Sequence, residues 1–192
     1  MADLEQLKQL REETGVSVSE CKKALEESAG NLEKAKEILR KWGKQLAGKK
    51  SERVAKAGIV ESYIHAEGRV GVLLEIRSET DFVSKSEEFR SLAHEVCLHI
   101  AAAKPLFLSE ETIPEDFLER EKKIYLEQLK GKPENLLNQI IEGKLKKFKE
   151  EVSLLSQPWI KDEEKTIRDL VNDYIAKLGE NIIIKNFARF EI

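Results

Sequence analysis

Cysteine is scarce in this sequence of 192 residues, which contains only Cys21 and Cys97. We place the two cysteines in different domains, so they form no disulfide framework and a reducing compartment fits best. No apolar run approaches the length of about 18 residues that identifies a membrane-spanning helix. The N-terminal segment MADLEQLKQLREE also lacks the apolar run of a signal peptide. We therefore expect a soluble, cytoplasmic protein with no membrane partner.

An excess of one charge sign is missing as well. The chain has 33 Lys and Arg residues against 36 Asp and Glu residues, which gives a formal net charge of -3 and a pI near 5.8. Broad electrostatic capture of nucleic acid needs a strongly basic face. The balance of charges therefore predicts no direct nucleic-acid partner.

Sequence motifs of catalysis are absent too. The chain contains no Gly-rich phosphate loop, no G-x-S-x-G and no H-E-x-x-H. His94, Cys97 and His99 are spaced so that only the first two share a helix face, and a fourth metal ligand is missing. No pair of carboxylates stands out as an acid/base dyad. We predict no metal and no cofactor. The absence of recognisable catalytic motifs favours a binding protein over an enzyme.

Residues 1–46 have the pattern of three short helices. Leu4, Leu7 and Leu10 recur at helical spacing up to Gly15, and a second helix runs from about Ser17 or Ser19 to Ser28. Asn31 can cap a third helix by accepting hydrogen bonds from its first backbone N–H groups. The three apolar faces predict a small bundle. Residues 47–55 are basic and lack apolar periodicity, which indicates a solvated linker.

Residues 56–192 mix strands and helices. A β-hairpin is predicted from Ile59–Ala66 and Arg69–Ser78, joined by Glu67-Gly68. Val70, Val72, Leu74 and Ile76 face one side of the second strand, which is therefore buried. Helices are expected over about 86–103, 114–130, 133–154 and 163–178, and a strand over 182–191. Pro114 and Pro133 suit the first turns of their helices, and Gly179 supplies a left-handed stop. The fold class is α+β: a three-helix N-terminal domain, then a core with a small antiparallel sheet flanked by helices.

The most informative segment is Thr80-Asp81-Phe82-Val83, between the second strand of the hairpin and the following helix. A large aromatic residue is unusual at such a corner, because turns face water and favour small polar residues. Two interpretations are open. Phe82 could fold back and fill the local core, or it could project as a rigid ring beside an acid and push into another protein.

Several segments resemble one known family. Leu10-Arg11-Glu12-Glu13-Thr14-Gly15 with Glu20-Cys21-Lys22-Lys23-Ala24-Leu25 is similar to the N-terminal signature of elongation factor Ts. Glu75 to Lys85, which contains the Phe82 corner, resembles its second signature. Leu154-Leu155-Ser156-Gln157-Pro158 and Gly179-Glu180-Asn181-Ile182 are also similar, so the resemblance covers nearly the whole chain in order.

The resemblance implies a guanine-nucleotide exchange factor for the GTPase elongation factor Tu. It implies that the N-terminal helices form a ubiquitin-associated-like domain, and that Asp81 and Phe82, within Thr80–Val83, disturb the partner's Mg²⁺ and phosphate site. Val18, Ser19 and Lys23 would contact the same GTPase. Two alternatives stay open: Lys23 is either a contact or a solvated helix position, and Arg11 is either a contact or a structural ion-pair partner. The chain is short for the family, in which short members pair two cores, so a homodimer through the core is expected.

Two rival classes remain at this stage. A scaffold or ubiquitin-like binding module would act through residues 1–46 alone, and the Phe82 corner would then be irrelevant. An enzyme acting on a small molecule would need a pocket lined by polar groups with shifted pKa values, and the sequence offers no such cluster.

Overall fold

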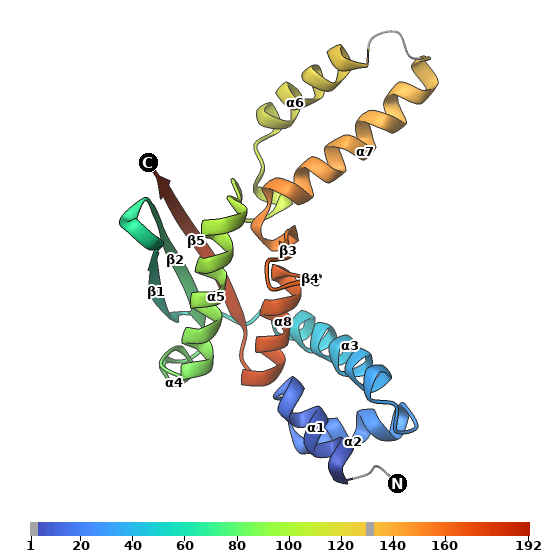
Figure 1. Ribbon diagram of the computed structural model, residues 1–192, viewed down its shortest axis with the longest axis vertical. Helices are drawn as coiled ribbons and strands as arrows, with labels where there is room; N and C mark the ends of the chain where they lie inside the picture. Colours follow the sequence, from blue (N-terminus) through green and yellow to red (C-terminus); the bar gives the residue numbers. More distant parts are fainter. Residues whose placement is uncertain (1–3, 130–132) are drawn as a thin grey trace. The chain divides into compact units, whose positions relative to one another are not determined.

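The computed structural model describes residues 4–129 and 133–192 (Figure 1). The contacts divide the chain into two units. The first comprises the residues up to Glu61 together with Glu75–Ala93 and Asp169–Lys185, and the second comprises Ser62–Leu74, His94–Arg168 and Asn186–Ile192. The helices are α1 (Leu4–Thr14), α2 (Val18–Glu27), α3 (Leu32–Lys50), α4 (Asp81–Ser84), α5 (Glu87–Ala103), α6 (Glu115–Gln128), α7 (Glu134–Val152) and α8 (Ile167–Leu178). The strands are β1 (Ala57–Ile64), β2 (Val70–Ser78), β3 (Pro158–Trp159), β4 (Asp162–Thr166) and β5 (Ile182–Glu191). The α+β class expected from the sequence is confirmed.

Helices α1, α2 and α3 form the expected bundle in the first unit (Figure 1). Their shared core is apolar and fully enclosed, and it consists of Leu10, Cys21, Ala24, Leu25, Ala35 and Leu39. The Asn31 side chain accepts a hydrogen bond from the Lys34 N–H at 3.0 Å, so the predicted cap of α3 is confirmed. Gly15 adopts a left-handed φ of 66° directly after α1, which closes that helix without strain.

Helix α3 continues through Lys50, so residues 47–50 are helical and were wrongly included in a solvated linker. The physical reason is packing against α8. A Cβ added at Gly43 would lie 3.5 Å from the Ala176 side chain, and Asp169 of α8 accepts ion pairs from Arg40 at 3.5 Å and Lys44 at 2.8 Å. The wider division of the chain at residues 46 and 56 stays a prediction.

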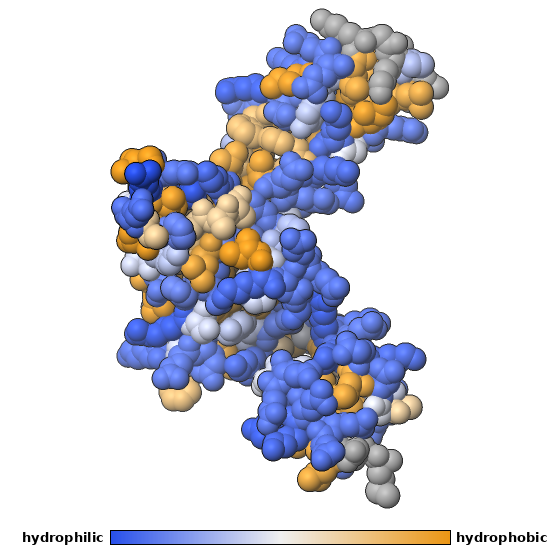
Figure 2. Space-filling model, in the orientation of Figure 1, coloured by the Kyte–Doolittle hydropathy of each residue, from blue (hydrophilic) through white to orange (hydrophobic). Residues whose placement is uncertain are grey.

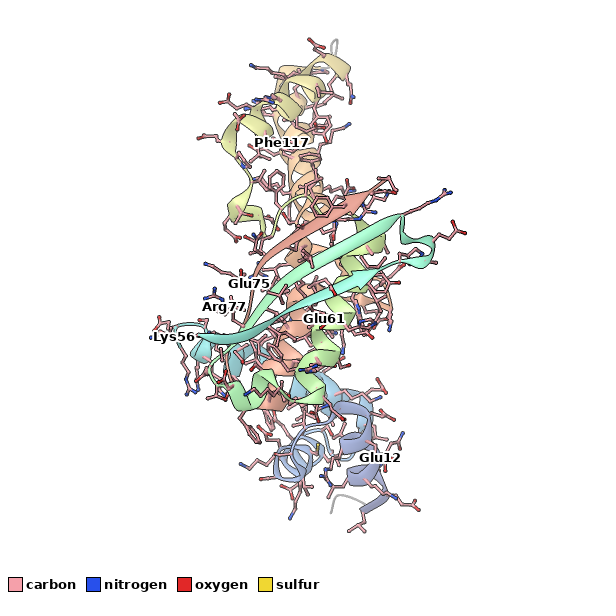
Figure 3. The ribbon with its side chains drawn as sticks, turned by 90° about the vertical axis from the view of Figure 1, so that its left-hand side faces the viewer. Glu12, Lys56, Glu61, Glu75, Arg77 and Phe117 are labelled. Atoms are coloured by element: carbon pink, nitrogen blue, oxygen red, sulfur yellow. The ribbon has the colours of Figure 1, made fainter. Side chains whose placement is uncertain are left out.

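The main sheet has the strand order β1-β2-β5. β2 begins one residue after the predicted strand and ends with it at Ser78, and its Val72, Leu74 and Ile76 are buried. Gly58 of β1 has no room for a side chain because the Ile76 carbonyl lies against it. Figure 3 looks onto the face of the sheet that carries Glu75 and Arg77, with α5 behind it. One face of α5 is fully buried, and it consists of Phe89, Leu92, Ala93, Val96 and Ile100.

Helices α6 and α7 lie side by side in the second unit, and apolar residues gather between them in Figure 2. Phe117 connects the base of this helical hairpin, with its ring 5.1 Å from that of Phe107 and 5.9 Å from that of Phe148. Such aromatic contacts stabilise by about 0.5–1.5 kcal/mol each beyond their buried area. Pro114 and Pro133 stand at the N-caps of α6 and α7, one position before the predicted first turns.

The region before α8 differs from the expectation of a helix from about 163. Asp162–Thr166 is a strand that pairs with β3 in antiparallel fashion, with Trp159 opposite Asp162, and α8 begins only at Ile167. The segment DEEKT contains no apolar residue, so it has no stripe with which to pack as a helix.

A buried polar contact holds the end of α5 in the second unit. His99 is fully buried, and its Nε2 lies 2.9 Å from Oε1 of Gln157. The Gln157 amide nitrogen donates to the carbonyl oxygens of Ala103 at 3.3 Å and Glu151 at 2.6 Å. Its Oε1 must therefore accept, which assigns the proton to Nε2 of a neutral His99. Burial lowers the pKa of His99, and the hydrogen bond with Gln157 partly offsets this effect.

Candidate partner-binding site

The corner predicted from the sequence is a single helical turn, α4 (Asp81–Ser84), immediately after β2. Thr80 is its N-cap, and the Thr80 hydroxyl accepts from the Val83 N–H at 3.4 Å. The Thr80 carbonyl accepts from the Ser78 hydroxyl at 3.0 Å and the Ser84 N–H at 3.2 Å. The corner is therefore a closed turn whose backbone groups have defined partners.

The side chains of this turn divide between the core and the solvent. Phe82 is 89% exposed, whereas Val83 is 6% and Ser84 2% exposed. Phe82 therefore does not fill the local core, and that interpretation is excluded by its exposure. Thr80 and Asp81 are also exposed. Val83 packs into the interior and anchors the turn, and Asp81 and Phe82 are the side chains of the turn that face the solvent.

The turn after α8 is hydrogen-bonded to the residues that precede α4. The Glu180 carboxylate accepts from the Thr80 N–H at 3.0 Å and from the Thr80 hydroxyl at 2.6 Å. In return, the Glu79 carboxylate accepts from the Asn181 N–H at 2.7 Å. Each segment thus supplies a carboxylate to a backbone N–H of the other, and charge-assisted hydrogen bonds of this kind are the strong ones.

Two further contacts fix the turn at 179–181. Gly179 has a left-handed φ of 76°, and its carbonyl accepts from the ammonium group of Lys50, a residue that is only 8% exposed. The Asn181 amide nitrogen donates to the Arg53 carbonyl at 2.7 Å. Sequence reasoning missed Lys50, Glu180 and Asn181 as supports, because their partners lie far away along the chain.

The second group of predicted site residues lies on α1 and α2. Arg11, Ser19 and Lys23 are exposed, and Val18 is 46% exposed at the start of α2. Ser17 caps that helix by accepting from the Glu20 N–H at 3.3 Å. Both groups of residues belong to the first unit but to different elements, so a partner would meet two separate contact surfaces.

A groove runs beside Lys23 in the first unit. Its volume is about 320 Å³, and its apolar lining includes Val16, Leu39, Trp42, Leu46 and Ala176. Lys23, Lys49 and Glu20 supply its charged rim. Leu39 and Trp42 of α3 form one wall of the groove and Ala176 of α8 contributes to the lining, a pairing that the local sequence pattern does not indicate.

The described residues contain no cluster of three or more His, Cys, Asp or Glu side chains that could hold a metal ion. Cys97 and His99 are buried and His94 is exposed, so the three residues do not form a common site. Within the same ranges, no helix is long and apolar enough to cross a membrane. Both cysteines are buried as free thiols, and burial raises the pKa of Cys21 while the Thr14 hydroxyl opposes the increase.

The fold and this site define a class of protein that presents one aromatic side chain on a fixed strand-to-helix corner, beside a separate three-helix bundle. Comparison with known proteins identifies the class further. The family model described as elongation factor TS matches residues 5–192. Elongation factor Ts of Caldanaerobacter subterraneus subsp. tengcongensis is 51% identical over 193 aligned residues, which cover 100% of this chain and 96% of the relative. Elongation factor Ts of Thermotoga petrophila is 50% identical over 186 residues, which cover 97% of this chain and 94% of the relative. The chain belongs to the elongation factor Ts family, and this assigns it to the translation elongation factors.

Proposed function

We propose that this protein binds elongation factor Tu and promotes the release of GDP, so that GTP can bind in its place. The observation that carries the proposal is Phe82, a ring that is 89% exposed on a turn with fixed backbone contacts. An exposed aromatic side chain on a rigid support is suited to insertion into a pocket of a partner, because little entropy is lost on binding. Membership of the elongation factor Ts family supports the choice of partner.

In this proposal Asp81 and Phe82 enter the nucleotide-binding domain and disturb the site that holds Mg²⁺ and the phosphates. Val18, Ser19 and Lys23, with Arg11 nearby, contact a second surface of the same GTPase. The protein acts in the cytoplasm by binding alone, without a cofactor and without a chemical step of its own. A factor that prefers the empty GTPase must weaken nucleotide binding by the same ratio.

The proposal includes a homodimer through the core. Exposed apolar side chains occur on all three strands of the main sheet: Val60, Ile64, Leu73, Ile183 and Phe190. The strand order β1-β2-β5 leaves two edges open, and exposed apolar groups of this kind are typical of association surfaces. A second copy is the proposed cover, with residues 1–46 outside the interface.

The test is the loss of fluorescent GDP from elongation factor Tu with and without this protein. We expect faster release with the protein, and a rise with its concentration to a plateau. We also expect saturating GDP to weaken the affinity of the protein for the GTPase. Unchanged release and unchanged affinity would contradict the proposal. Full binding by residues 1–46 alone would instead favour the scaffold or ubiquitin-like module.

A further inference from the structure

We propose that Glu180 is a positioning residue for nucleotide release, because its carboxylate fixes Thr80 and thereby sets the direction in which Phe82 leaves the surface. The inference rests on the proposed function and extends it to a residue outside the Phe82 corner. Glu180 does not belong to α4, and it is separated from Thr80 by 100 residues of sequence.

The Thr80 hydroxyl lies within hydrogen-bond distance of both Glu180 and the Val83 N–H. A hydroxyl has one hydrogen and two lone pairs. Thr80 donates its hydrogen to Glu180 at 2.6 Å, which leaves a lone pair free to accept from the Val83 N–H at 3.4 Å. The carboxylate therefore selects the hydroxyl orientation that caps α4.

The same carboxylate also binds the backbone of Thr80. The other oxygen of Glu180 accepts from the Thr80 N–H at 3.0 Å. One carboxylate thus binds both the main chain and the side chain of the N-cap residue, and Thr80 can rotate only if both bonds break. Phe82 is two residues further along a turn of four residues, so its direction follows from the orientation of Thr80.

The segment that carries Glu180 is itself held in place by several contacts. The flanking residues Gly179 and Asn181 are held by Lys50, by the Glu79 carboxylate and by the Arg53 carbonyl. Lys50 and Asn181 are 8% and 3% exposed, so these contacts are partly buried. A carboxylate on such a support is preorganised, and a misplacement of about 1 Å at a distant site can cost on the order of 100-fold in rate.

The experiment compares Glu180→Gln, Glu180→Ala and Thr80→Val with wild type in the release of fluorescent GDP from elongation factor Tu. Glutamine keeps the size of the side chain but replaces one accepting oxygen with a donor. Bonds to a charged group are typically strong enough that we expect the release rate at saturating factor to fall about tenfold in Glu180→Gln. The factor concentration at half-maximal rate should change much less. Thr80→Ser keeps the hydroxyl and should lose less of the release rate than Thr80→Val, which removes it.

Two combinations separate positioning from a structural role. Thr80→Val with Glu180→Gln should lose less than the sum of the two single variants, because both remove the bond between the Thr80 hydroxyl and the Glu180 carboxylate. Glu180→Gln should also add little to Phe82→Ala, because it acts through that ring. Glu26→Gln, which removes an exposed carboxylate of α2 near Lys22, is the matched control and should leave release unchanged. Additive losses in either combination would overturn the inference.

Amide hydrogen exchange of the free protein provides a readout that does not depend on elongation factor Tu. Glu180→Gln should accelerate exchange of the segment 79–85, while the α1–α3 bundle keeps its protection. Unchanged exchange of 79–85, or faster exchange with wild-type release, overturns the role of Glu180. If wild type itself fails to accelerate release, the proposed function is wrong, and the exchange data still decide whether Glu180 holds the corner.

Discussion

The Glu79 carboxylate accepts a hydrogen bond from the backbone N–H of Asn181 at 2.7 Å, across 102 residues of sequence. It also pairs with the Arg53 guanidinium at 3.6 Å. The end of β2 is thereby joined to the turn between α8 and β5. The contact places the corner of the candidate site on regular elements, which hold a functional side chain more precisely than a free loop does.

Phe82→Ala should slow GDP release without lowering the melting temperature. The ring is 89% exposed, so the folded protein gains little from it. Its burial in a partner is worth about 1.5–3 kcal/mol, which corresponds to roughly 10- to 100-fold in binding. Fluorescent GDP release at saturating factor measures the effect.

Leu126→Ala serves as the control for Phe82→Ala, because Leu126 is 41% exposed on α6 and lies outside both the proposed contact with the GTPase and the proposed dimer surface. It should keep the wild-type release rate. If Phe82→Ala clearly lowers the melting temperature but leaves GDP release normal, the proposed insertion of Phe82 into the GTPase is contradicted.

Lys23→Ala should affect binding more than release. Lys23 is exposed on α2 and borders the groove lined by Trp42 and Leu46. An exposed charge contributes about 0.2–1 kcal/mol to a contact, so we expect about a two- to fivefold higher half-saturating concentration of factor. The maximal release rate should stay within about twofold of wild type, because Lys23 does not act at the nucleotide site.

Lys22→Ala is the control for this experiment, since Lys22 is the neighbouring exposed lysine and its ammonium lies 4.0 Å from Glu26. Equal effects of the two variants would show that the loss is one of general charge. A strongly lowered maximal rate in Lys23→Ala would assign the residue to the release step.

The sequence alone was sufficient for the parts of the molecule that depend on local patterns. Alternating Val and Ile residues defined β2, and the Asn31 cap and the apolar faces of the first three helices defined the bundle. The local pattern singles out Phe82, because an aromatic residue contradicts the usual composition of a turn, but it leaves open whether the ring fills the core or projects outward. These features need only neighbours within a few residues.

The remaining features depend on residues that meet only in the folded chain. The small residue Gly43 allows α3 to approach Ala176 of α8, and nothing in the local pattern of α3 indicates this contact. Lys50 was assigned to solvent and is instead buried against the Gly179 carbonyl. Glu180 carried no local signal, because a carboxylate at a turn is common and its partner Thr80 is distant in sequence.

Leu73→Asp should weaken the proposed dimer. Leu73 is 48% exposed on β2, and an aspartate would place an unpaired charge in an apolar interface. We expect the dimer to dissociate at least about tenfold more readily, because a single fully buried leucine is worth about 1.5–3 kcal/mol. Sedimentation of the full chain at micromolar concentration gives the mass.

Ile124→Asp is the control for the dimer, since Ile124 is equally 48% exposed but lies on α6, outside the main sheet. It should leave the mass unchanged. A monomeric wild-type protein at these concentrations would reject the dimer, and a dimer that persists in Leu73→Asp would move the interface elsewhere.

The stability of the fold should fall as the pH is lowered from 7.5 to 5.5, with His99 as one cause. Burial lowers the pKa of His99 below the ordinary value of 6.5. Below pH 6.5 the unfolded chain therefore binds a proton that the folded chain does not, so acidification favours unfolding. The contribution of His99 is fully present above pH 6.5 and is lost as the pH falls from there towards the lowered pKa, with a slope of at most about 1.4 kcal/mol per pH unit.

His99→Gln isolates this effect. Glutamine can still donate to Gln157, but it does not titrate. The melting temperature of the His99→Gln variant should therefore depend less on pH between 7.5 and 5.5 than that of wild type. Lys104 and Arg189 lower the pKa of Glu191 to about 2, so that carboxylate stays ionised throughout this window and does not confuse the comparison. Nδ1 of His99 has no hydrogen-bond partner in the part of the chain that the structure describes. Protonation of Nδ1 would bury an unpaired donor at the junction of α5 and α7. If the melting temperatures of wild type and His99→Gln change equally with pH, His99 is not a cause of the acid destabilisation.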